Sequence, residues 1–314
     1  NYHIARAAVV GSGTMGGAIA ALLAGVGISV NLLDIAPSVL TKEEASKGLA
    51  LGSPKVRNRI VQSGLDRIST SRPQAFYSKS DMNLIRIGNL VDDFAELSEV
   101  DWVIEVIVED MATKRDFFKR LDTIRPYGQI VSSNTSGIPI CNLATGLSED
   151  FRRHFLGTHF FNPPRYLRLL EVIPTRDTDS DLVDFFIQFA SHRLGKGVVV
   201  CKDTPNFIAN RVGWANNGFR MRFGLDNGYT VEEVDEIAGP LMGYPKTAVF
   251  RLLDLVGLDV AIMVAMNIAN TFPGDSTGQR AESGAGEVMN TLVERSWLGN
   301  KTGIGFYKQI MKPD

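Results

Sequence analysis

The chain has 314 residues, enough for two domains with a hydrophobic core each. Hydrophobic residues make up 44% of it, charged residues make up 22%, and the formal net charge is −2. This composition is that of an ordinary globular protein and carries no global signal for binding nucleic acid or an anionic membrane. No apolar run reaches the roughly 18 residues of a membrane-spanning helix, so no membrane span is expected.

The two cysteines, Cys141 and Cys201, are too few for a disulfide framework in a chain of this length. Neither lies at a metal-ligand spacing, so both are expected to be buried free thiols and no metal site is expected. A reducing, cytoplasmic location fits this usage best. The chain begins without methionine and ends on a charged stretch, which suggests a piece of a longer polypeptide.

The first 34 residues predict one βαβ unit. A buried strand is expected over 6–10, an apolar helix over 14–24 and a second strand over 28–34. Residues 37–79 are different, because they are mostly helical in pattern and rich in Lys and Arg. They hold eight basic and three acidic residues, a local charge of +5.

Alternation of strand and helix then resumes and continues to Cys201. Helices are expected over 112–124 and from a cap at Asp179 to Leu194. The strands are expected over 102–105, 129–132, 155–160, 169–173 and 198–201.

After Cys201 the patterns are helical, and this shift predicts a domain boundary. We therefore expect an α/β Rossmann-type NAD-binding domain with a helical insertion over 1–202, followed by an all-α domain over 203–314. Residues 272–286 are rich in Gly and Ser and are expected to form a mobile loop. The helices of the second domain are expected over 205–225, 231–238, 247–270 and 285–297.

A Gly-x-Gly-x-x-Gly loop follows the first strand and opens the first helix, as a dinucleotide site requires. Its glycines allow a tight turn, close approach of backbone to a pyrophosphate, and packing of the helix on the strand. Asp34 ends the second strand, where a carboxylate binds ribose hydroxyls and repels a 2′-phosphate, so NAD is favoured over NADP. The alternative is a glycine-rich turn of another α/β protein. The cofactor-binding residues expected in the loop are Gly11, Gly13, Thr14, Met15 and Gly16.

Among the four histidines, His159 stands out because it lies within an otherwise apolar strand. If 155–161 and 168–174 form an antiparallel hairpin centred on Arg165, His159 is directly opposite Glu171. An imidazole beside a buried carboxylate suits a general base. A core histidine bonded to a structural acid is an equal alternative.

Two further polar segments are candidates. The loop 132–137 follows a strand and would lie at the sheet edge where doubly wound folds bind ligands. It can equally be a helix-capping loop. Asn210, one helical turn after Asn206, is expected to reach from the second domain toward the cleft, or to belong to a polar helix face.

Together these motifs resemble the L-3-hydroxyacyl-CoA dehydrogenase family over nearly the whole chain. The resemblance implies that His159 is the catalytic base with Glu171 as its partner, and that Ser136 and Asn210 hold the substrate oxygen. The residues implied on the cofactor side are Glu109, Lys114 and Asn134. The motifs that carry the resemblance are residues 9–16, 105–110, 133–136, 159–163, 202–205, 252–259 and 301–307.

The resemblance also places the basic segment beside the nucleotide of CoA. Its candidates for the CoA phosphates are Lys55, Arg57 and Arg59, which would be unremarkable as a solvated helix face. Outside this segment, Asn162 is a candidate for contact with the substrate.

Two departures from the family pattern matter. The family often has a second serine where this chain has Gly137, and small apolar residues where it has Arg165 and Tyr166. The second departure resembles the dehydrogenase part of the long bacterial fatty-acid-oxidation proteins.

The expected reaction is oxidation of an (S)-3-hydroxyacyl-CoA to the 3-ketoacyl-CoA, with NAD as cofactor. A same-fold dehydrogenase acting on a hydroxy acid or diketone without CoA is the alternative, and a structural protein that retains only NAD binding is a third hypothesis. The long apolar faces of the C-terminal helices predict a homodimer.

Overall fold

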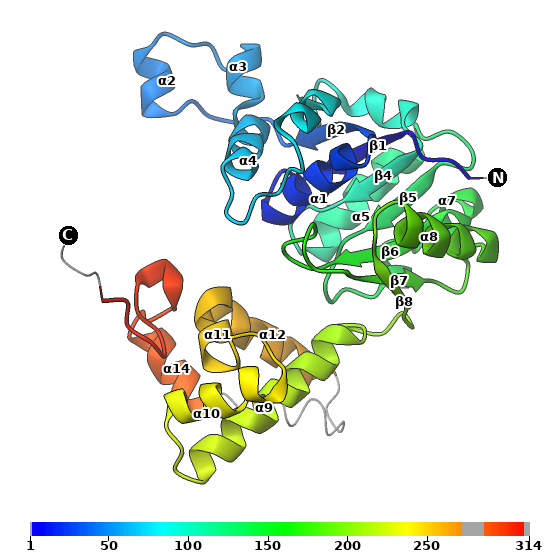
Figure 1. The fold of residues 1–314 in the computed structure, drawn as a ribbon. Helices are drawn as coiled ribbons and strands as arrows, with labels where there is room; N and C mark the ends of the chain where they lie inside the picture. The colour runs from blue at the N-terminus through cyan, green and yellow to red at the C-terminus, as the bar shows by residue number, and fades with distance from the viewer. Residues whose placement is uncertain (1, 272–285, 311–314) are drawn as a thin grey trace. The chain divides into compact units, whose positions relative to one another are not determined.

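The computed structural model describes residues 2–271 and 286–310. The chain divides into two compact units, Asn1–Phe207 and Ile208–Asp314; the first contains the sheet and the second is helical (Figure 1). The sequence placed the boundary after residue 202. The units divide a few residues later, because Asp203 is still hydrogen-bonded to the first unit.

The first unit is built on one eight-stranded sheet in the order β3-β2-β1-β4-β5-β6-β7-β8. Neighbouring strands run parallel except at β6 and β7, which pair antiparallel. The order reverses between β1 and β4, the switch point at which doubly wound sheets bind ligands. The strands are β1 Arg6–Val10, β2 Ser29–Asp34, β3 Ile85–Asn89, β4 Trp102–Glu105, β5 Ile130–Ser133, β6 Phe155–Phe160, β7 Leu169–Pro174 and β8 Gly197–Val200.

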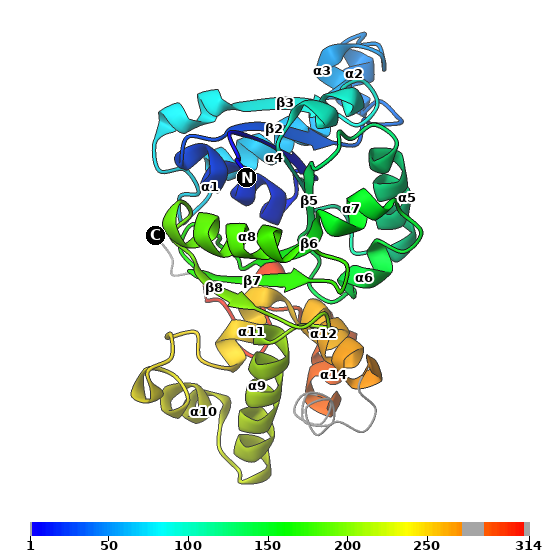
Figure 2. The same cartoon turned by 90° about the vertical axis from the view of Figure 1, so that its right-hand side faces the viewer.

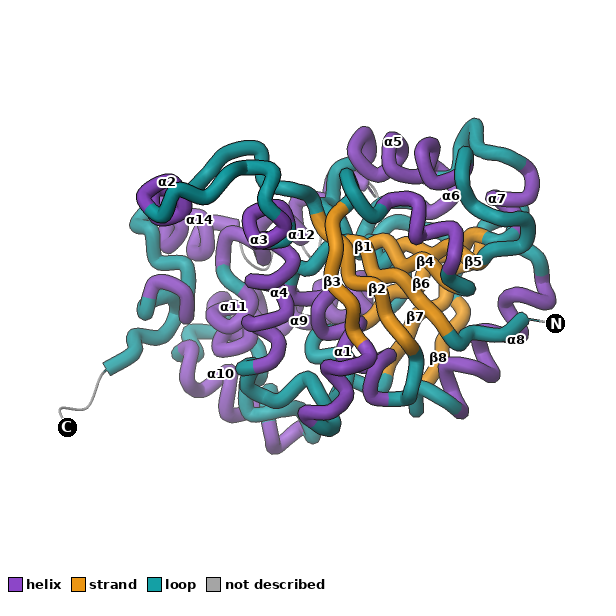
Figure 3. Tube along the Cα trace, turned by 90° about the horizontal axis from the view of Figure 1, so that it is seen from above, coloured by secondary structure: helices purple, strands orange, loops and turns teal. Residues whose placement is uncertain are grey.

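Helices cover both faces of this sheet. Figure 3 shows α1 and α8 on one side of the strands, with α5 and α6 on the other. Ala7 and Val9 of β1 belong to the core on the first side, and Ala8 and Val10 to the core on the second. Burial on both faces explains why β1 is uniformly apolar. These helices are α1 Thr14–Gly25, α5 Met111–Asp122, α6 Ile140–Leu143, α7 Glu149–Arg153 and α8 Ser180–His192.

The basic segment forms short helices that leave the sheet after β2, as Figure 1 shows for α2 and α3. They are α2 Lys42–Ser46, α3 Pro54–Arg57 and α4 Arg59–Ser69, with a 3₁₀ turn, η1, over Lys79–Leu84. The sequence did not predict β3, which follows this turn. Since β3 is an edge strand with Arg86 exposed, its apolar pattern is short and interrupted.

The second unit has its own core, centred on Val249, Phe250 and Leu253. Figure 2 shows α9 as its long helix, with α10 beside the C-terminal part of α9. The single helix expected over 247–270 is wrong: it is broken at Gly257, whose φ of 100° is not helical. The helices are α9 Ala209–Asp226, α10 Val231–Ile237, α11 Phe250–Val256, α12 Leu258–Thr271 and α14 Gly286–Glu294, with 3₁₀ turns η3 Pro240–Met242 and η4 Asn300–Thr302.

Two further expectations from the sequence are corrected. Cys201 is buried, but Cys141 is exposed, because it lies in the short surface helix α6. Asn206 is not in a helix, since its φ is 61° and α9 begins only at Ala209.

The loop expected over 272–286 lies outside the described residues except for its last position. Within the part of the chain that the structure describes, no helix has both the length and the apolarity that a membrane crossing demands.

Candidate functional site

The glycine loop joins β1 to α1 at the switch point of the sheet. Gly11 has a φ of 106°, and a Cβ on it would lie 2.4 Å from the carbonyl oxygen of Val106. A Cβ on Gly16 would lie 1.8 Å from the carbonyl oxygen of Gly11, so neither position admits a side chain. Among the described residues, nothing comes within 4 Å of a Cβ built on Gly13. Backbone is therefore open to a ligand at Gly13.

The first turn of α1 starts with Thr14 and Met15, and among the described residues no side chain caps it. Its N–H groups and the helix dipole are therefore available to an anion. A phosphate of a dinucleotide fits both the charge preference of this helix end and the open backbone at Gly13.

Asp34 lies beside this loop, at the end of β2. Its Oδ2 accepts hydrogen bonds from the N–H and the hydroxyl of Ser12, at 2.6 Å and 2.5 Å, and its Oδ1 accepts one from the N–H of Ile35. The carboxylate is thus oriented by the glycine loop. A carboxylate at this place suits the hydroxyls of an adenosine ribose.

Helix α4 packs against the same loop, which the sequence did not indicate. Gly64 lies so close that a Cβ would be 2.4 Å from the carbonyl oxygen of Ser12, and the guanidinium of Arg67 donates to that oxygen at 3.0 Å.

A buried ion pair supports the other side of the switch point. The ammonium of Lys114 on α5 lies 2.6 Å from Glu105 at the end of β4, and these side chains are 1% and 0% exposed. Burial raises the pKa of the Glu105 carboxyl, and the charge of Lys114 opposes that shift. The sequence singled out Lys114 but missed Glu105, because a glutamate ending an apolar strand has no local signal for its partner.

Glu109 connects this pair to the loop after β5. Its Oε2 lies 3.3 Å from the Lys114 ammonium, and its Oε1 accepts the hydroxyl of Thr135 and the N–H groups of Ser136 at 3.0 Å and Gly137 at 3.3 Å. Two residues that the sequence singled out separately, Glu109 and Ser136, therefore lie together.

The hairpin of β6 and β7 has the predicted register, with His159 directly opposite Glu171. The Nδ1 of His159 lies 2.8 Å from Oε2 of Glu171, and both side chains are buried. The side chain of Asn134, from the end of β5, accepts the N–H of Phe160 at 2.9 Å. Asn134 thus ties the end of β5 to the strand that carries His159.

The loop between β6 and β7 is held from two directions. The buried ammonium of Lys196 donates to the carbonyl oxygens of Pro164 and, at 2.8 Å, Leu167. The two residues that depart from the family pattern bind the segment after α4: Arg165 donates to the carbonyls of Gln74 and Phe76, and the hydroxyl of Tyr166 to that of Gln74 at 3.0 Å. Asn162 is exposed at the start of this loop.

The basic candidates stand apart from these groups, on α3 and at the start of α4. Arg57 is paired with Asp92 at 2.5 Å and 2.7 Å, and Arg59 with Glu44, while Lys55 is exposed. Two of the three cations thus already face carboxylates.

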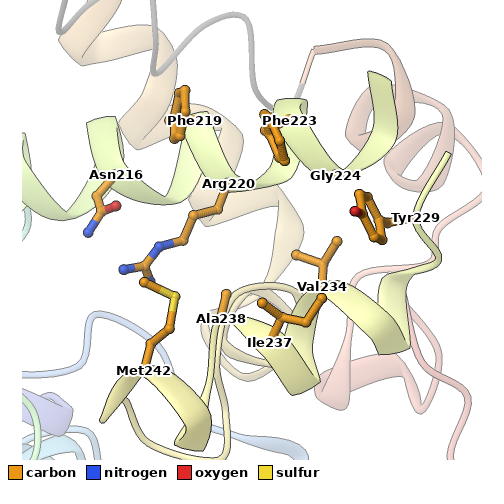
Figure 4. Close-up of a pocket in the computed structure, with 10 residues that line it drawn as sticks. All are labelled: Asn216, Phe219, Arg220, Phe223, Gly224, Tyr229, Val234, Ile237, Ala238 and Met242. Atoms are coloured by element: carbon orange, nitrogen blue, oxygen red, sulfur yellow. The ribbon is translucent and has the colours of Figure 1, made fainter. Parts of the chain in front are cut away.

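Asn210 lies on α9, in the second unit. That unit has a pocket of about 320 Å³ between α9 and α10, with a mainly apolar lining. Figure 4 shows its side chains, with Arg220 extending from α9 toward Met242. In the described part of the chain, no cluster of three or more His, Cys, Asp or Glu side chains is arranged to hold a metal ion.

Comparison with known proteins adds a family to this geometry. Residues 6–204 match the family model of the NAD binding domain of 3-hydroxyacyl-CoA dehydrogenase, and residues 207–309 match the model of its C-terminal domain.

Individual relatives carry the name of the same enzyme. A probable 3-hydroxyacyl-CoA dehydrogenase of Bacillus subtilis is 49% identical over 98% of this chain, which spans 38% of that protein's length. A protein of the same name from Deinococcus radiodurans is 44% identical over 98% of this chain and 83% of its own length. The crystal structure of the (S)-3-hydroxybutyryl-CoA dehydrogenase of Ralstonia eutropha matches with a TM-score of 0.74 at 28% identity, covering 98% of this chain and 100% of that one.

Lys196 generates a prediction about stability. Burial lowers its pKa to about 8, whereas a lysine in the unfolded chain titrates near 10.4. Between these values the unfolded chain binds more protons, so the free energy of unfolding rises with pH across this window. We expect wild type to gain about 1–3 kcal/mol relative to Lys196→Met from pH 8 to pH 10.5, by urea denaturation.

The exposed Lys119 on α5 offers the matched control, because Lys119→Met changes the same atoms at the surface. Its stability should follow the pH dependence of wild type. Parallel curves for wild type and Lys196→Met would contradict the prediction.

Proposed function

The chain belongs to the 3-hydroxyacyl-CoA dehydrogenase family, and on that premise we propose that it oxidises an (S)-3-hydroxyacyl-CoA to the 3-ketoacyl-CoA in fatty-acid β-oxidation. The observation that carries the proposal is the buried pair of His159 and Glu171, 2.8 Å apart. Oxidation of a hydroxyl needs a base for its proton, and a histidine oriented by a carboxylate is suited to that task.

The cofactor is NAD, whose binding domain the first unit matches. We propose that Gly11, Gly13, Thr14, Met15 and Gly16 bind the pyrophosphate and that Asp34 binds the adenosine ribose. Open backbone at Gly13 and the uncapped start of α1 support this assignment. When bound, NAD supplies the two-electron acceptor for the hydrogen that leaves C3 of the substrate.

The roles of the remaining residues are proposed from the family resemblance, and contacts support those of Glu109, Lys114 and Ser136. Glu109 and Asn134 would hold the nicotinamide side, with Lys114 orienting Glu109 through their 3.3 Å ion pair. Ser136, Asn162 and Asn210 would position the substrate, with Ser136 and Asn210 on its oxygen. The N–H of Ser136 donates to Glu109, so one carboxylate would orient groups on both sides of the reacting carbon.

His159 is proposed to accept the hydroxyl proton at Nε2. Its Nδ1 faces Glu171, which fixes the tautomer and stabilises the imidazolium that forms. The proton then leaves the imidazole to solvent or buffer before the next turnover.

The CoA part of the substrate is assigned to the basic segment. Arg57 and Arg59 have carboxylate partners, whereas Lys55 is exposed. Among the three candidates, Lys55 is therefore the one proposed to bind a phosphate of CoA.

The proposed location of the protein is the cytoplasm.

The substrate class is tested by following NADH oxidation in the reverse direction. We expect turnover with acetoacetyl-CoA and with 3-ketoacyl-CoA thioesters of increasing chain length. Acetoacetate and a simple diketone should give little or none. Turnover with these non-CoA compounds alone would favour the alternative, a same-fold dehydrogenase of hydroxy acids or diketones.

The role of His159 is tested by His159→Gln, which keeps a polar side chain of similar length but cannot act as a base. We expect kcat to fall by roughly 10²–10⁴-fold, while the Kd for NADH, from fluorescence titration, stays unchanged. His192→Gln makes the same change at the exposed end of α8 and should retain wild-type turnover. Turnover like wild type in His159→Gln would overturn the assignment of the base.

We also propose a homodimer through the helices of the second unit. Phe219 and Phe223 on α9 are 55% and 54% exposed beside the apolar pocket, and an apolar surface of this kind is typical of an interface. Light scattering at micromolar concentration should give twice the mass of the chain. A monomer under these conditions would contradict the proposal.

A further inference from the structure

A segment just before the end of the first unit has an unusual backbone. Asn206 and Phe207 have φ values of 61° and 48°, in the left-handed region that residues with a side chain rarely adopt. Asparagine is the residue that best tolerates this region after glycine, but for a bulky phenylalanine it is an outlier. Such a conformation persists only where surrounding contacts impose it, and it occurs preferentially at functional sites.

Contacts on both sides of Asn206 hold this segment in place. Asp203 accepts the N–H groups of Ile140 at 2.6 Å and Cys141 at 2.7 Å, which fixes the segment to the start of α6. The ring of Phe207 is 1% exposed, and its centre lies 5.6 Å from that of the His159 ring. The residue between these anchors, Asn206, is therefore held in one place beside the site.

The side chain of Asn206 lies over the loop that carries Ser136. It is 4% exposed, and its Oδ1 is 3.2 Å from where a Cβ on Gly137 would be, with its Nδ2 at 3.9 Å. Gly137 is the position at which the family often has a second serine. In this chain the space beside residue 137 is filled by a polar side chain from a different segment.

We infer that Asn206 is a positioning residue of this site, whose carboxamide replaces the side chain missing at Gly137 and holds Ser136 in place for the substrate. The inference rests on the proposed function, because it assigns Ser136 to the substrate. Glu109 holds the loop through the N–H groups of Ser136 and Gly137, and Asn206 restrains it beside Gly137. A side chain at residue 137 would therefore press on the carboxamide of Asn206, which would have to shift by a few tenths of an ångström to make room for it.

The test is a double-mutant cycle of Gly137→Ser, Asn206→Gly and the double variant, assayed with acetoacetyl-CoA and NADH. Gly137→Ser brings a new Cβ to 3.2 Å from Asn206, and Asn206→Gly leaves the loop without its support. Each single variant should lose roughly tenfold in kcat, and the double variant should return to within about threefold of wild type, because neighbouring substitutions of this kind are not additive.

Two readouts separate positioning from folding. The Kd for NADH should stay within about twofold of wild type in every variant, since the glycine loop and the side chains of Glu109 and Asn134 are unchanged. Asn206→Gly should not lower the melting temperature in proportion to its loss of kcat, because glycine adopts a φ of 61° freely. Ser296→Gly is the matched control, because it also places glycine at a φ of 61°, but in the second unit. It should keep wild-type kcat.

The outcomes are distinct. Absence of turnover by wild type with any 3-ketoacyl-CoA would overturn the proposed function itself. If wild type is active, an unchanged kcat in Asn206→Gly would overturn the role of Asn206. So would a double variant whose loss equals the product of the two single losses.

Discussion

The turn after β4, from which the candidate site is built, is held by the ion pair of Lys114 and Glu105, two opposite charges 2.6 Å apart in the interior. Removal of charges from water is tolerated only when they are paired and hydrogen-bonded. Glu105 meets this condition, because it also accepts the N–H of Ile107 and the hydroxyl of Ser133. Loss of either partner would leave an uncompensated buried charge, which costs about 3–5 kcal/mol. The turn after β4 is thereby fixed between the sheet and α5.

The groups proposed for cofactor and substrate both start from this turn. The carbonyl of Val106 packs so closely on Gly11 that no side chain fits between them. This contact fixes the position of the glycine loop relative to the turn after β4. Glu109, three residues further, binds the backbone of Ser136 and Gly137. A single turn therefore contacts both the glycine loop and the polar loop after β5, and a reaction between two bound molecules needs a constant distance between the groups that hold them.

The sequence predicted the features that depend on neighbours in the chain. The opposition of His159 and Glu171 follows from strand periodicity and the centre of one hairpin, so the register was confirmed. Features that depend on distant partners were missed. Glu105 has no local sign that Lys114 will meet it, Gly257 lies inside an unbroken apolar pattern, and Asn206 appears helical until its contacts with another loop are known. The local charge of the basic segment was an equally incomplete guide to a phosphate site, because it does not show which of its cations already face carboxylates.

Cys141 has a chemical consequence for a protein proposed to handle thioesters. The thiol is exposed, yet partial burial and the neighbouring carboxylate of Asp203 raise its pKa to about 11. The thiolate is the nucleophilic form, and a raised pKa keeps this sulfur mostly protonated at neutral pH. An acyl-CoA in solution is an acyl donor to any thiolate that it meets, and transfer would leave the protein S-acylated and the CoA free. The carboxylate that anchors α6 thus also lowers the fraction of Cys141 that is thiolate, the form that such a transfer needs.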